Sequence, residues 1–155
     1  MPSQSKILRN VPFHRQEQDN WCIPACAQMI LGVHGQRKLE QATIADTMQT
    51  SPAGTLLSDE IAGYRTILGN NFVVTNAAVN WDRAKEEIDA GYPFRIRINE
   101  DTHAVVCIGY EINQQSDNTG YYDLILILND PHEGESIHFN WDSISQYDYL
   151  FIHKS

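Results

Sequence analysis

The chain has 155 residues, 42% hydrophobic and 20% charged, so it is long enough to bury a core, and we expect one domain over residues 1–155. Its net charge of -9 argues against nucleic acid and anionic membranes as main partners, because both require basic patches. The three cysteines, Cys22, Cys26 and Cys107, are too few and odd in number for a disulfide framework, which favours a reducing compartment.

The sequence carries no sign of membrane insertion or of a secretory signal. No apolar run approaches the length of a membrane span, and residues 1–6 lack an apolar stretch. We therefore expect a cytoplasmic protein, or one exported by a route that needs no signal peptide. The sequence gives no indication of oligomeric state.

The first half of the chain has helical periodicity. An apolar stripe spans Cys22–Val33, with Asp19 or Asn20 available to cap its start. Further helical patterns cover Leu39–Met48, Leu56–Leu68 and Trp81–Ala90.

After Pro93 the pattern becomes strand-like, beginning with a clear period of two. The residues between Asn113 and Gly120 predict a polar loop between two strands. Because helices precede strands, the order predicts an α+β fold, with an N-terminal helical lobe packed on a C-terminal antiparallel β-sheet. The predicted strands are Phe94–Ile98, His103–Tyr110, Tyr121–Leu128, Ser136–Phe139 and Tyr147–Ile152.

Cys22 has the sequence context of a nucleophile. It falls in the first turn of a predicted helix, where free N–H groups and the positive end of the helix dipole favour a thiolate. His103 opens a predicted strand and could pair with the thiol, then protonate a leaving amine. Asp130 or its neighbour Asn129, after the next strand, could orient the imidazole. This chain order is typical of a thiol protease.

Attack on a carbonyl also requires donors for the developing oxyanion. The backbone N–H of Cys22 is one candidate. Gln16, six residues before the cysteine, could supply a side-chain amide, and Gln18 is the competing residue.

Several segments, in this order, resemble papain-like cysteine peptidases of the compact bacterial type. That group includes staphopain-like enzymes, papain-fold effector proteases of plant pathogens and double-glycine leader peptidases of bacteriocin exporters. The Gln16-to-Cys22 spacing and the Trp21-Cys22 pair, followed by Ala25 and a helix, resemble the nucleophile segment. The other matching segments are Ile88–Phe94, His103–Tyr110, and Asn129-Asp130-Pro131 with Gly134, Phe139 and Trp141.

The resemblance implies a papain-like fold with a central nucleophile helix. It implies hydrolysis of a peptide or protein substrate through an acyl-thioenzyme, without a cofactor. Cys22, His103 and Asp130 would form the triad, and the compact relatives favour Asp130 because their third residue directly precedes proline. Gln16 would stabilise the oxyanion. The expected substrate contacts are Trp21, beside the nucleophile, and His132, at the rim of the cleft.

Other interpretations remain open at this point. An amidase or isopeptidase could use the same fold and residues, and a catalytically idle module could bind peptides in the cleft. A zinc site is a further alternative, but Cys-x3-Cys on a helix with His-x3-Cys on a strand is not a usual zinc spacing, so we expect no metal. Its ligands would be Cys22, Cys26, His103 and Cys107.

Overall fold

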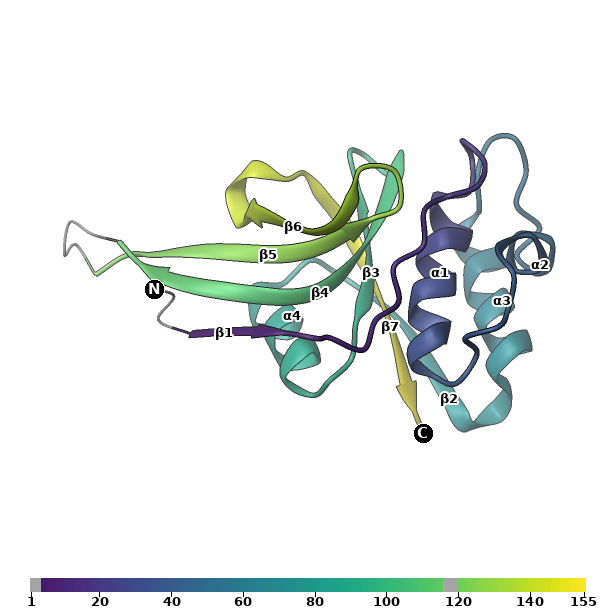
Figure 1. The fold of residues 1–155 in the computed structure, drawn as a ribbon, viewed down its shortest axis with the longest axis horizontal. Coiled ribbons are helices and arrows are strands. Elements are labelled where there is room, and N and C mark those ends of the chain that lie inside the picture. The colour runs from purple at the N-terminus through teal and green to yellow at the C-terminus, as the bar shows by residue number, and fades with distance from the viewer. Residues whose placement is uncertain (1–3, 116–119) are drawn as a thin grey trace.

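The computed structural model describes residues 4–115 and 120–155. Within them, seven strands form one antiparallel sheet in the order β2-β7-β3-β4-β5-β6, and β1 pairs with β4 (Figure 1). The strands are β1 Gln4–Ile7, β2 Phe72–Ala77, β3 Phe94–Ile98, β4 His103–Gln114, β5 Tyr122–Asp130, β6 Gly134–Asn140 and β7 Gln146–Lys154.

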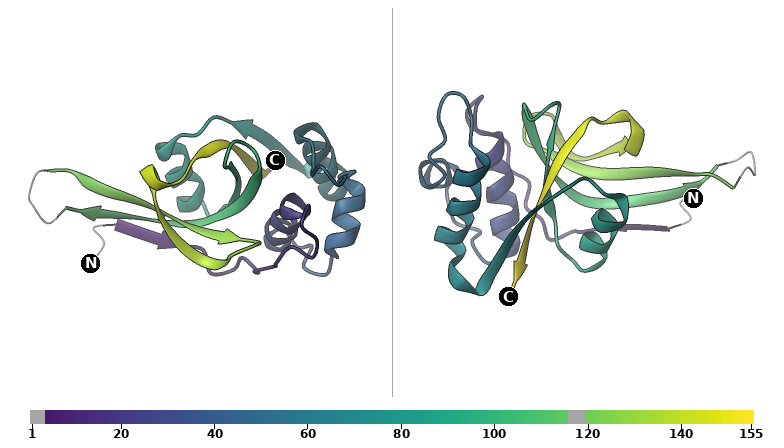
Figure 2. Two further views of the ribbon diagram at one scale, coloured as in Figure 1. Left: turned by 90° about the horizontal axis from the view of Figure 1, so that it is seen from above. Right: turned by 180° about the vertical axis from the view of Figure 1, so that it is seen from behind.

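Three helices gather at one end of the sheet, and the long β4–β5 ribbon projects away from them (Figure 2). All four predicted helices are confirmed, with ends shifted by no more than two residues, and so is the α+β architecture. The described residues contain no helix long and apolar enough to span a membrane. The helices are α1 Cys22–Val33, α2 Gln41–Thr47, α3 Leu57–Leu68 and α4 Trp81–Asp89, with short 3-10 turns at Gly69–Asn71 and Trp141–Ser143.

Two apolar clusters cover the two faces of β4, because successive side chains of a strand point in opposite directions. Val106 and its alternate neighbours face α1, α2 and α3, which form the helical lobe. Val105 and Cys107 face the second cluster, with β7 and α4. Helix α1 is buried from Ile23 to Gly32 and so forms the centre of the first cluster.

The structure corrects three details of the predicted layout. β1 and β2 were not predicted, and both add to a sheet that was expected to come entirely from the second half of the chain. Helix α4 packs with the second cluster rather than in the helical lobe. β4 continues to Gln114, which shortens the expected polar loop, and residues 116–119 of that loop lie outside the described residues.

β1 lies unusually close to β4 at Gly109. A Cβ atom there would lie 2.6 Å from the carbonyl oxygen of Lys6 and 3.1 Å from Ile127 Cδ1. Only glycine allows this approach. The N-terminal strand is thereby held against the strand that begins with His103.

Candidate active site

Cys22 is the first residue of α1, and its thiol is free and half-buried. Pro24 occupies the first turn, where a missing N–H costs no hydrogen bond. The cap residue is Trp21, without a side-chain hydrogen bond. Neither Asp19 nor Asn20 caps the helix. The Asn20 amide instead donates to the Ser51 carbonyl at 2.7 Å, which ties the loop before the cysteine to the loop before α3.

His103 and Asp130 lie side by side where β4 begins and β5 ends. The distance from His103 Nε2 to Asp130 Oδ1 is 2.8 Å. Asp130 is almost fully buried, and Oδ1 also accepts the backbone N–H of His132 at 2.8 Å and of Glu133 at 3.2 Å. The two backbone N–H groups of this turn therefore hold the carboxylate in place independently of the imidazole.

Cys22 lines the same hollow as His103 and acts on the pKa of the imidazole through a side-chain hydrogen bond and its charge. Burial alone would lower the pKa of His103. The hydrogen bonds and charges of Asp130 and Cys22 outweigh burial and raise it from 6.5 to about 9. For Asp130, burial alone would raise the pKa. The hydrogen bonds of the carboxylate to His103, His132 and Glu133 outweigh burial and leave the pKa below the usual value of 3.8. The raised pKa of His103 and the lowered pKa of Asp130 therefore favour an imidazolium paired with the Asp130 carboxylate.

The other two cysteines are fully buried, on opposite faces of the sheet. Burial raises the pKa of Cys26 well above its usual value and that of Cys107 to about 12. The four candidate zinc ligands do not converge: within residues 4–115 and 120–155, no group of three His, Cys, Asp or Glu residues could hold a metal ion.

Gln16 lies beside the His103–Asp130 pair, held by its backbone N–H to the Pro131 carbonyl at 2.9 Å. Its side-chain nitrogen donates to the carbonyls of Gln18 and Asp19, both at 3.0 Å. Both amide hydrogens are therefore used within the loop. The side-chain oxygen is buried without a partner among the described residues.

Two hollows flank His103, which lines both. The first has a volume of about 450 Å³ and the second about 330 Å³. Gln16, Asp130, His132 and Phe139 are among the residues of the first. The second contains Cys22, Ala53, Gly54, Leu56, Asp59, Arg97, Asp101 and Ala104.

The remaining predicted residues differ in how close they come to this site. His132 is exposed and lines the first hollow. Neither Trp21 nor Gln18 lines either hollow. Trp141 packs edge-to-face on Trp81 in the second cluster.

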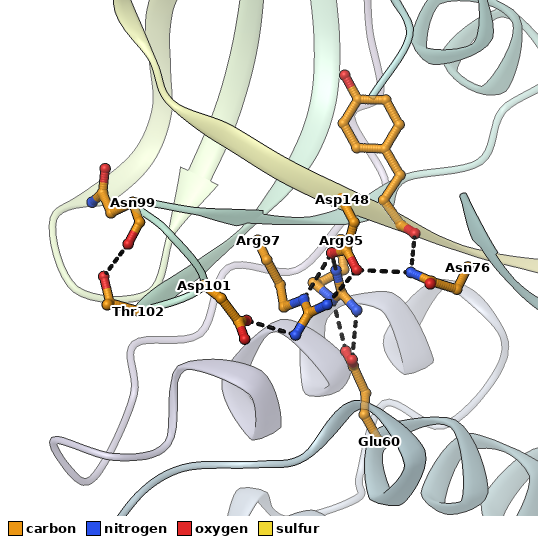
Figure 3. Close-up of polar contacts among 9 residues, drawn as sticks. Glu60, Asn76, Arg95, Arg97, Asn99, Asp101, Thr102 and Asp148 are labelled. Atoms are coloured by element: carbon orange, nitrogen blue, oxygen red, sulfur yellow. Dashed lines mark hydrogen bonds and ion pairs between the residues drawn. The ribbon is translucent and has the colours of Figure 1, made fainter. Parts of the chain in front are cut away.

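Sequence reasoning missed a buried ion-pair network (Figure 3), which reaches the second hollow at Arg97. Arg95 of β3, 0% exposed, donates from Nε and Nη2 to both carboxylate oxygens of Glu60 on α3, at 2.8 and 2.6 Å. Its Nη1 donates to Asp148 of β7 at 2.6 Å. The signal in the sequence was the alternation of Arg95 and Arg97, which places both guanidinium groups on one face of β3.

Comparison with known proteins identifies the class. The fold is that of papain-like cysteine peptidases, as the sequence resemblance indicated. The family model described as Peptidase_C39 like matches residues 8–150, and the chain belongs to this family. No curated protein matched the chain.

Solved structures share the fold at low sequence identity. The peptidase domain of Streptococcus ComA, an ABC transporter involved in quorum sensing, has a TM-score of 0.68 at 14% identity, with 92% of this chain and 97% of that one covered. A double glycine motif protease from an AMS/PCAT transporter, in complex with the leader peptide, also gives 0.68 and 14%, with 99% and 100% covered. UfSP from C. elegans gives 0.62 and 14%, covering 98% of this chain but 34% of that one.

The His103–Asp130 pair should make the free energy of unfolding depend on pH. The pKa of His103 rises from 6.5 to about 9 on folding. The contribution of His103 to the free energy of unfolding is therefore complete below pH 6.5 and is lost as pH rises through 9. Because the pKa of Asp130 falls below 3.8, its contribution is present above that pH and is lost on acidification. The stability that Asp130→Asn loses, measured by urea denaturation, should be largest between pH 3.8 and 6.5 and shrink toward pH 9.

Asp46→Asn is the matched control, because Asp46 is exposed on α2. Its loss should vary little over the same range. A loss for Asp130→Asn that is independent of pH would contradict the coupling between the two groups.

Proposed function

We propose that the protein cleaves peptide bonds through an acyl-thioenzyme, with Cys22 as nucleophile, His103 as general base and acid, and Asp130 as the residue that orients the imidazole. The observation that carries this proposal is the continuous series of contacts from Cys22 through His103 to Asp130, with a hollow on each side. One solved relative in fold is a protease bound to a leader peptide, which supports a peptide as substrate here.

In the first step the Cys22 thiolate would attack the carbonyl carbon of the scissile bond. The backbone N–H of Cys22 has no acceptor within its helix, so it is free to donate to the oxyanion. His103 would then protonate the leaving amine as the C–N bond breaks. In the second step His103 would take a proton from water, whose oxygen attacks the thioester and releases Cys22.

Gln16 would supply the second oxyanion donor. Because both of its amide hydrogens are bonded to Gln18 and Asp19, one of these bonds has to be exchanged for the oxyanion when substrate binds. His132 lies at the rim of the first hollow and would contact the substrate there. A contact from Trp21 stays a prediction, since the ring lies outside both hollows.

Replacing the triad residues should reduce kcat/KM unequally. In comparable triads, loss of the nucleophile or base costs on the order of 10⁶-fold and loss of the orienting residue roughly 10⁴-fold. Cys22→Ala and His103→Ala should therefore be inactive, and Asp130→Ala should retain about 100 times more activity than either. Activity is measured by mass spectrometry of new termini in a peptide library.

The matched controls are Cys26→Ala and His138→Ala. The Cys26 thiol is buried in the core, and His138 lies on β6 outside both hollows. Circular dichroism checks the fold of each variant. Turnover by Cys22→Ala would eliminate the assignment. Ammonia release by the wild type without new termini would instead favour the amidase alternative.

Gln16→Ala should lower kcat by about 10²–10³-fold, because one oxyanion donor is lost. Alkylation of Cys22 by iodoacetamide should be unchanged, since that reaction builds no oxyanion. Gln18→Ala is the control and should behave like wild type, because its side chain lines neither hollow and its carbonyl is kept. If the two phenotypes are exchanged, Gln18 is the donor.

A further inference from the structure

We propose that Arg97 and Asp101 are positioning residues that hold His103 against Cys22, by tying the turn between β3 and β4 to the buried ion-pair network. The proposal rests on the proposed function, in which the imidazole and the thiol act together. It assigns a role in the reaction to the charges of Arg97 and Asp101 (Figure 3), which line the same hollow as Cys22 and His103.

The network provides a fixed base for this turn. Arg95 connects Glu60 of the helical lobe to Asp148 of the sheet, and all three side chains are buried. Two-pronged contacts between guanidinium and carboxylate allow little variation in geometry. A buried charge left without its partner is costly, so the contacts stay closed. Asp148 is therefore a rigid point relative to both α3 and β7.

Arg97 connects this rigid point to the turn. Its Nε donates to Asp148 Oδ1 at 2.7 Å and its Nη2 pairs with Asp148 Oδ2. Its Nη1 donates to Asp101 Oδ1 at 2.6 Å. The Arg97 side chain is 11% exposed and that of Asp101 is 43% exposed. A single guanidinium thus joins a buried anchor to a solvent-facing turn residue.

The turn itself needs such support. Asn99, Glu100 and Asp101 have φ values of 53, 57 and 71, so three successive residues other than glycine adopt the left-handed conformation. Such conformations persist only where surrounding contacts hold them. Thr102 donates to the Asn99 carbonyl from its backbone N–H at 3.1 Å and its hydroxyl at 2.7 Å. His103 follows directly, paired with Ile98 across the two strands.

The second hollow is lined by Arg97, Asp101, Cys22 and His103. Because the turn leads directly into His103, a change in the turn would move the imidazole relative to the thiol. Asp59 is a further carboxylate there. The opposite side of His103 carries other charged and titratable groups, namely Asp19, Asp130, His132 and Glu133.

These charges give the proposal a test by sign. Removing the Asp101 carboxylate takes away a negative charge, which alone would favour the Cys22 thiolate and move alkylation to lower pH. Displacing His103 would remove the cation beside the thiol and move alkylation to higher pH. A merely electrostatic role and a positioning role therefore predict opposite shifts.

The experiment measures the pH dependence of Cys22 alkylation by iodoacetamide, followed by mass spectrometry, in the full chain. For Asp101→Asn we expect the midpoint to move to higher pH and kcat to fall about tenfold or more, toward the roughly 10²-fold that a misplacement of 1 Å can cost. Glu100→Gln removes a carboxylate from the same turn that makes no ion pair within the described residues, and it should leave both quantities unchanged.

His103→Ala separates this proposal from the proposed function. If it leaves the alkylation midpoint unchanged, the thiol–imidazole pair itself is wrong. If it raises the midpoint while Asp101→Asn lowers it or leaves it unchanged, the pair stands and the positioning role is overturned. A double variant with Arg97→Gln should be no worse than the more severe single variant, because Asp101 acts through its contact with Arg97. Additive losses would also overturn the role.

Discussion

The hydrogen bond between His103 Nε2 and Asp130 Oδ1 is the contact on which the site depends. It joins the beginning of β4 to the end of β5, and two backbone N–H groups also hold the Asp130 carboxylate. The imidazole therefore has one fixed neighbour, and Cys22 acts on it from the hollow that both residues line. Because α1 brings the cysteine from the helical lobe, the pair that we propose to react requires the helical lobe and the sheet to keep a constant separation.

Apolar packing and buried charges both maintain that separation. The first cluster presses α1 against β4, which is strong but has little directional preference. The pairs of Arg95 with Glu60 and Asp148 add direction, since each guanidinium contact is satisfied in only one geometry. Because burial of charge costs desolvation energy, this network contributes more to fixing the geometry of the two lobes than to stability. It ends at the turn that precedes His103.

The sequence predicts those parts of the molecule whose patterns are local. The apolar stripe gave the bounds of α1, strand alternation gave β3, and a run rich in Ala, Val and Ile gave the start of β4. β1 was missed because a strand of four residues with mostly exposed side chains acquires its identity only by pairing. β2 was missed because its six residues form a short, partly buried run that only pairing with β7 defines. Arg95 and Arg97 look like solvent-facing positions of an amphipathic strand, and their buried partners Glu60 and Asp148 lie 35 or more positions away. The amide bonds of Gln16 depend on the conformation of its loop, which no pattern encodes.

The ion pair centred on His103 is tested most directly by measuring the charge of that imidazole. Nitrogen NMR of histidine-labelled protein reports this charge across a pH titration. We expect His103 to titrate near pH 9, with a midpoint that falls toward 6.5 in Asp130→Asn and falls less far in Cys22→Ala. Because the imidazolium is stabilised by its neighbours, this result would show the ion pair that the proposed chemistry requires. A wild-type His103 that titrates at or below 6.5 would contradict it.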